Sequence, residues 1–171
     1  RLINAEAGCE IVFKCENLQK VGAFKARGAH NAVLCLSQEQ LARGVATHSS
    51  GNHAAALALA ASHFGVPAYF VMPDNAPASK VAAVRAYGGA ITFCESTQAA
   101  REATLQDLCA RTGASFIPPY DHPDVIAGQG TTALELAEQL EQVPDFLLTP
   151  VGGGGLLAGC AVASRALLPA S

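Results

Sequence analysis

Four consecutive glycines, Gly152, Gly153, Gly154 and Gly155, stand just before an apolar stretch that is typical of a helix. Backbone N–H groups at a helix start carry partial positive charge, and glycines leave them uncovered, so such a loop binds an anion, most often a phosphate. The stretch has neither the spacing of a dinucleotide-binding loop nor that of a P-loop. A flexible turn is the alternative, but four glycines entering an apolar helix are unfavourable without a ligand. We therefore predict a phosphate site here.

A second candidate anion site lies at residues 48–53, which read His-Ser-Ser-Gly-Asn-His. The hydroxyls of Ser49 and Ser50, with the N–H groups of a helix that begins at about Asn52, suit a carboxylate. An ordinary helix cap is the alternative, although a single Ser or Asn would be enough for that. Ligands of open α/β sheets gather at the carboxyl ends of strands, where we expect both loops to lie.

Lys25 is a candidate nucleophile, because it follows Phe24 near a predicted helix start. An amine among small and aromatic neighbours is partly desolvated, which lowers its pKa and makes it reactive toward carbonyl groups. On local sequence alone, a solvated surface lysine is the simpler interpretation. A phosphate site, a carboxylate site and a candidate Schiff-base lysine together indicate pyridoxal phosphate acting on an amino acid.

Alternating short strands and Ala-rich helices would have to position these residues. Apolar and β-branched runs predict strands at 11–15, 45–47, 68–72, 90–93, 115–117 and 146–149. Helical patterns predict helices at 23–36, 52–64, 79–87, 97–111, 131–141 and 156–168. Such alternation is typical of an α/β fold with a parallel sheet.

The same pattern suggests how the chain is divided. A proline-rich stretch at 118–123 is predicted to be a linker. We expect a compact α/β unit at 44–121, flanked by two pieces, 1–43 and 122–171, that need each other. Because no strand follows the last predicted helix, we also expect the sheet of the flanking pieces to be incomplete in this chain.

Composition restricts the class of protein. Of 171 residues, 50% are hydrophobic and 15% charged, which excludes disorder. A net charge of −3 leaves no basic stripe for nucleic acid or an anionic membrane surface. Apolar stretches are too short to cross a bilayer, and the first residues lack the apolar core of a signal peptide, so we expect a cytoplasmic protein.

Disulfides and metal ions are the remaining alternatives to weigh. The six cysteines lie far apart with no C-x-x-C pair, which favours buried, reduced thiols. His48 and His53 have a poor spacing for one helical face and no Cys or acidic residue beside them. We therefore predict no metal site from these residues.

Five stretches in the same order resemble a known family: 13–20, 22–29, 49–53, 127–131 and 152–155. Together they resemble the fold-type II pyridoxal-phosphate enzymes, the tryptophan synthase β-like group, and within it the serine racemase and threonine/serine dehydratase branch. Stretch 118–131 is most similar to serine racemases and threo-3-hydroxyaspartate ammonia-lyases. The resemblance implies parallel open twisted sheets, with a small domain at 44–121 and parts of a large domain at 1–43 and 122–171.

The resemblance also implies a role for each candidate residue. Lys25 would hold the cofactor and remove the substrate Cα proton, and Asn52 would hydrogen-bond the cofactor's phenolic oxygen. Ser50 would face the opposite side of the substrate. The phosphate would be bound by N–H groups of Gly152, Gly153, Gly154, Gly155 and Leu156. The substrate carboxylate would be bound by Ser49, Ser50, Gly51, Asn52 and His53.

The activity that the resemblance implies is racemisation or dehydration of serine, threonine or a 3-hydroxy amino acid, with keto acid and ammonia as the dehydration products. A strict threonine or threo-3-hydroxyaspartate ammonia-lyase is one alternative. A non-catalytic cofactor-binding module and a plain nucleotide-binding domain are two others. The family is usually a homodimer about twice this length, and its divalent-cation site, for Mg2+ or a similar ion, would use residues outside this chain. Lys20 and Tyr87 match a nucleotide effector site of some racemases.

Overall fold

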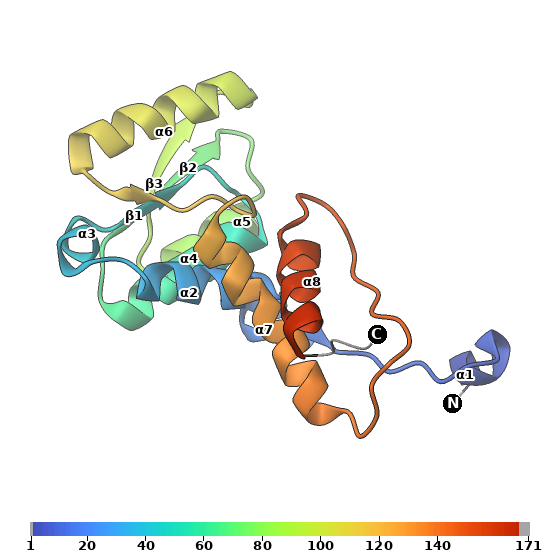
Figure 1. Cartoon of the computed structure of the whole chain (residues 1–171). Helices are drawn as coiled ribbons and strands as arrows, with labels where there is room; N and C mark the ends of the chain where they lie inside the picture. Colours follow the sequence, from blue (N-terminus) through green and yellow to red (C-terminus); the bar gives the residue numbers. More distant parts are fainter. Residues whose placement is uncertain (1, 168–171) are drawn as a thin grey trace.

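A four-stranded parallel sheet forms the centre of the computed structural model, which describes residues 2–167 (Figure 1). Its strand order is β3-β2-β1-β4, and each neighbouring pair is parallel. The strands are β1 (Val45–Thr47), β2 (Ala68–Pro73), β3 (Ala90–Cys94) and β4 (Ser115–Phe116). This confirms the α/β fold and the four strands predicted within 44–121, while the proposed domain boundaries stay a prediction.

Different helices cover the two faces of this sheet (Figure 1). The helices around it are α2 (Lys25–Leu34), α3 (Gln38–Arg43), α4 (Asn52–Phe64), α5 (Ala78–Ala86) and α6 (Gln98–Thr112). Side chains of β2 alternate between the faces, as the period of a strand requires. Phe70 and Met72 are buried with α2 and α4, whereas Val71 packs with Leu105 and Leu108 of α6. The sheet is therefore buried between two separate apolar layers.

Two further helices extend the layer that contains α2: α7 (Pro123–Gln139) packs against α2, and α8 (Gly155–Leu167) packs against α7 (Figure 1). Glycines allow their backbones to approach closely. A Cβ atom on Gly128 would lie 2.6 Å from the Cα of Gly28, and one on Gly130 would lie 2.8 Å from the carbonyl oxygen of Gly159. These contacts hold the first turn of α2, with Lys25, against α7, and they hold α7 against α8.

We expect Gly128→Ala to destabilise the fold by about 1–3 kcal/mol, because the new methyl group must push α2 away from α7. Urea denaturation would measure the change. Ala127→Ser is the matched control, since Ala127 is exposed on the same helix and should change stability by less than about 0.5 kcal/mol. Equal stability of Gly128→Ala and the wild type would show that α2 and α7 can move apart to accept the methyl group without a cost in stability.

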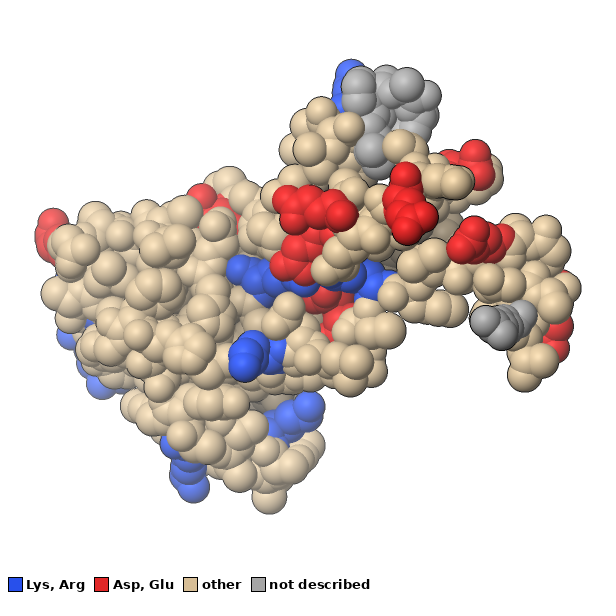
Figure 2. Space-filling model, turned by 90° about the horizontal axis from the view of Figure 1, so that it is seen from below, with Lys and Arg blue, Asp and Glu red and all other residues tan. Residues whose placement is uncertain are grey.

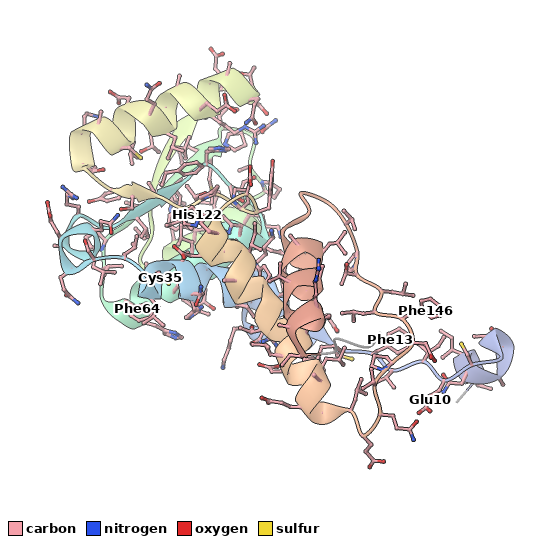
Figure 3. The ribbon with its side chains drawn as sticks, viewed as in Figure 1. Glu10, Phe13, Cys35, Phe64, His122 and Phe146 are labelled. Carbon is pink, nitrogen blue, oxygen red and sulfur yellow. The ribbon has the colours of Figure 1, made fainter. Side chains whose placement is uncertain are left out.

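Three expectations about secondary structure are wrong. Residues 11–15 and 146–149 are not strands, because neither segment has a strand beside it in the described part of the chain. Figure 3 shows Phe13 and Phe146 on these segments, away from the sheet. Helix α7 begins at Pro123, not at 131, because His122 caps the helix and proline suits the first helical turn. The predicted end of the last helix at 168 lies outside the described residues.

Short helices were not predicted. They are α1 (Leu2–Ala7), α3, and the 3-10 turns η1 (Glu16–Leu18) and η2 (Lys20–Gly22). For α3 a sequence signal existed, since Ser37 and Gln40 form a capping box. The other elements are too short for a hydrophobic period to develop.

The structure shows where the cysteines and the charged side chains lie. All six cysteines are free, but Cys9, Cys15 and Cys35 are exposed, so the expectation of buried thiols is wrong for these three. On the face drawn in Figure 2, Lys and Arg are scattered or lie beside acidic residues. Among residues 2–167, every helix is too short or too polar to span a lipid bilayer, and no group of three potential metal ligands occurs.

Candidate active site

Lys25 is the first residue of α2, which the chain enters through left-handed backbone at Val21 and Gly22. Its Nζ donates a hydrogen bond of 2.5 Å to the carbonyl oxygen of Pro119 and lies 5.0 Å from the centre of the Phe24 ring. Burial lowers the pKa of the Lys25 amine from its ordinary value. A lower pKa increases the fraction of uncharged amine, which is the form that attacks carbonyl groups.

The glycine loop lies next to Lys25. A cavity of about 320 Å³ is lined by Phe24, Lys25, Tyr120 and the segment 150–156, which contains the four glycines and Leu156. Two of these segments are more than 120 residues apart in sequence, so only the fold brings them together. The predicted phosphate loop and the predicted nucleophile therefore share one cavity.

The loop has the geometry that a phosphate needs. It precedes the 13-residue helix α8, whose first N–H groups have no partner within the helix. A Cβ atom on Gly152 or Gly154 would meet nothing within 4 Å, so the backbone there is open to a ligand. Gly154 has a φ of 84°, a conformation that favours glycine. The residues present therefore fit a cofactor with a phosphate at one end and an aldehyde that reaches Lys25.

The loop between β1 and α4 holds the predicted substrate residues. Gly51 is the residue before α4, and no side chain caps the helix. The Ser49 hydroxyl accepts a hydrogen bond of 3.3 Å from the Gly51 N–H, and within the described residues the Ser50 hydroxyl makes none. The cap interpretation therefore does not account for these serines. None of residues 49–53 lines the cavity of Lys25 and the glycines, and their binding roles stay predictions.

His53 differs from its neighbours because its side chain is buried, with 2% exposed. Its Nε2 lies 2.9 Å from the carbonyl oxygen of Ile117 and must donate to it. Burial, with smaller contributions from Lys25 and His48, lowers the pKa of His53 to about 4, so the ring is neutral at pH 7. Its one N–H is already used, and the route left to a substrate carboxylate is the His53 backbone N–H in the first turn of α4.

We expect acid to destabilise the fold through His53. The pKa of His53 is about 4 in the folded state and that of an ordinary histidine is 6.5, so the unfolded chain binds the extra proton first as pH falls. Stability is then lost progressively between about pH 6.5 and 4, by up to about 3 kcal/mol. Urea denaturation at pH 7 and pH 4.5 would measure this. His53→Gln keeps an N–H donor that does not titrate, so this variant should lose less stability at pH 4.5 than the wild type. If its stability has the same pH dependence as that of the wild type, His53 is not the group responsible.

Sequence reasoning missed an ion-pair cluster around Arg27. The Arg27 side chain is 7% exposed, and its nitrogens donate to both carboxylate oxygens of Glu16 and of Glu135 at 2.7–2.8 Å. Lys14 also pairs with Glu135 at 2.7 Å, and the two cations hold the pKa of that carboxyl at about 2. The cluster joins α2 to η1 and α7 two residues after Lys25. Because Glu135 is 108 positions away from Arg27, no local pattern could have shown it.

The predicted effector residues lie apart from this cluster. Lys20 is exposed in η2, and Tyr87 follows α5 with 36% of its surface exposed. The structure places them on different elements, and within the described residues no hydrogen bond joins them. A nucleotide site at Lys20 and Tyr87 stays a prediction.

Comparison with known proteins decides the family. The model of the family described as pyridoxal-phosphate dependent enzyme matches residues 1–171, the whole chain. The chain belongs to this family. The finding confirms the fold-type II resemblance.

Individual relatives point to one branch of the family. The chain is 54% identical over 169 residues to the L-threo-3-hydroxyaspartate ammonia-lyase of Saccharomyces cerevisiae, covering 99% of this chain and 52% of that protein. It is 50% identical to the serine racemase of Arabidopsis thaliana, covering 98% and 50%. The crystal structure of the Dictyostelium discoideum serine racemase matches with a TM-score of 0.94 and 49% identity, covering 98% and 54%. The chain thus spans about half the length of the curated relatives it matches.

Proposed function

We propose that the protein is a pyridoxal-phosphate-dependent racemase and dehydratase of serine, threonine or another 3-hydroxy amino acid. The observation that carries this proposal is the cavity shared by Lys25 and the glycine loop. Similarity to a serine racemase and to a hydroxyaspartate ammonia-lyase supports the substrate class.

Residues of this chain would hold the cofactor at both ends. The N–H groups of residues 152–155 and of Leu156, at the start of α8, would bind the phosphate. Lys25 would bind the aldehyde end through its amine, whose lowered pKa favours the reactive, uncharged form. Asn52, exposed at the first position of α4, would hydrogen-bond the phenolic oxygen.

Proton transfer would then depend on two side chains. Pyridoxal phosphate, when bound, supplies the electron sink that makes the substrate Cα–H acidic. Lys25 would take this proton, and the Ser50 hydroxyl would return one on the opposite face, which inverts the configuration. Where no proton is returned, the β-hydroxyl leaves instead, and keto acid and ammonia result. Ser49 and the backbone N–H groups of Gly51 and His53 would hold the substrate carboxylate.

The strict ammonia-lyase is the second candidate, favoured by the 54% identity to a hydroxyaspartate ammonia-lyase. The presence of Ser50 supports a racemase, because elimination needs no proton donor on the second face. We further propose a homodimer, by analogy with the family. A cytoplasmic location is supported by the free cysteines, since exposed thiols persist in reducing compartments.

The function can be tested on the complete gene product supplied with pyridoxal phosphate. L-Serine, L-threonine and L-threo-3-hydroxyaspartate would be added separately, with keto acid, ammonia and D-amino acid measured for each. Keto acid together with D-serine supports the racemase and dehydratase, and keto acid alone supports the strict lyase. If neither product forms although the cofactor is bound, the chain is a binding module.

A further inference from the structure

The segment from Ile117 to Tyr120, directly after β4, touches each part of the candidate site. Its first residue is held by the sheet, because the Ile117 N–H donates to Ala46 at 2.9 Å. The Ile117 carbonyl oxygen accepts a hydrogen bond from Nε2 of His53, the last of the predicted substrate residues 49–53. The Pro119 carbonyl accepts from the Lys25 amine. We name residues 117–120 the bridging segment.

Tyr120, the last residue of the bridging segment, supports the glycine loop. A Cβ atom on Gly153 would overlap Cγ and Cδ1 of the Tyr120 ring and lie 2.8 Å from Cδ2. A Cβ atom on Gly155 would lie 3.0 Å from the Tyr120 carbonyl oxygen and 3.2 Å from its Cα. The ring therefore rests directly on the loop backbone, and the main chain of Tyr120 rests on the start of α8. The Tyr120 carbonyl oxygen also accepts a hydrogen bond from the backbone N–H of His122. His122, which Figure 3 labels, caps α7.

We propose that Tyr120 is a positioning residue of the cofactor site. Its ring sets the path of the glycine loop, and the adjoining Pro119 carbonyl sets the position of the Lys25 amine, so that one short segment determines how far apart the two ends of the site lie. This inference rests on the proposed cofactor site. It also gives a second reason for glycine at position 153, since a side chain there would displace the ring.

A double-mutant cycle separates this reason from the simpler one, that the phosphate itself needs a bare backbone at Gly153. The variants are Gly153→Ala, Tyr120→Ala and the double variant, with Tyr120→Phe as the conservative control. Cofactor affinity would be measured on the complete gene product by titrating the visible absorption of the lysine-bound cofactor. Melting of each apo variant shows whether it is folded.

We expect Gly153→Ala to weaken cofactor binding by about tenfold or more, because the ring and loop must separate. In the Tyr120→Ala background, where the ring is already absent, Gly153→Ala should weaken binding by no more than about threefold, and Tyr120→Phe should bind as the wild type does. Two results would overturn the inference: a loss of affinity on Gly153→Ala that is as large in the Tyr120→Ala background as in the wild type, or wild-type binding by Gly153→Ala.

Two further comparisons keep the test decisive. If Gly153→Ala does not fold, the comparison of Tyr120→Ala with Tyr120→Phe decides, since only the loss of the ring should weaken binding, by about fivefold or more. Equal affinity of these two variants would overturn the proposal. A wild-type protein that binds no pyridoxal phosphate would overturn the proposed function and this inference together, whereas normal wild-type binding without coupling overturns this inference only.

Discussion

Lys25→Ala should abolish the visible absorption of the lysine-bound cofactor and reduce turnover by at least about a thousandfold. The amine lies in the cavity with the glycine loop, and burial lowers its pKa, so it is placed to bind an aldehyde and then to move a proton. Alanine removes both capacities. Absorption spectra and keto acid formation would measure the two losses, and borohydride reduction of the wild type followed by peptide mapping should find the cofactor on Lys25.

Lys80→Ala is the matched control, because Lys80 is exposed on α5 and should be indifferent to both measurements. Lys25→Arg tests the chemistry rather than the charge. Arginine keeps a cation at this position but does not lose its proton, so it should fail as alanine does. A visible band that survives in Lys25→Ala would show that another lysine holds the cofactor.

Ser50→Ala should separate the two reactions of the proposed enzyme. We expect D-serine formation to fall by about a hundredfold or more, because a proton donor on the second face is lost. Keto acid formation should fall much less, by about fivefold or less, because elimination does not need that proton. The Ser50 hydroxyl makes no hydrogen bond within the described residues, so its removal breaks no internal contact.

Ser49→Ala gives the comparison for this prediction. Ser49 is proposed to bind the substrate carboxylate, so its loss should weaken both reactions together and mainly through KM. Chiral chromatography of the product and a keto acid assay would be run on the same samples. Equal loss of racemisation and elimination in Ser50→Ala would remove Ser50 from the proton-returning role.

Much of the fold could be predicted from sequence, because the decisive signals are local. The helix at Asn52–Phe64 and the strand at Val45–Thr47 have the predicted bounds, since a short apolar run, a turn and an Ala-rich helix each leave a pattern within a few residues. Segments 11–15 and 146–149 have the same strand-like composition, but neither pairs with another strand among residues 2–167. Composition reports the preference for a strand, whereas pairing needs a partner far along the chain.

The candidate site likewise has features that the sequence predicts and features that only the tertiary structure shows. The types and order of Lys25, the serines of 49–53 and the four glycines were sufficient to predict a cofactor and a class of substrate, because anion binding and amine chemistry follow from residue types in local sequence. Only the tertiary structure brought Lys25 into one cavity with the glycine loop and buried His53, leaving it neutral. Only the fold showed Tyr120 against Gly153 and Arg27 between Glu16 and Glu135. Burial, pKa and contact depend on which distant segments meet, and distant contacts leave no periodic trace in a single sequence.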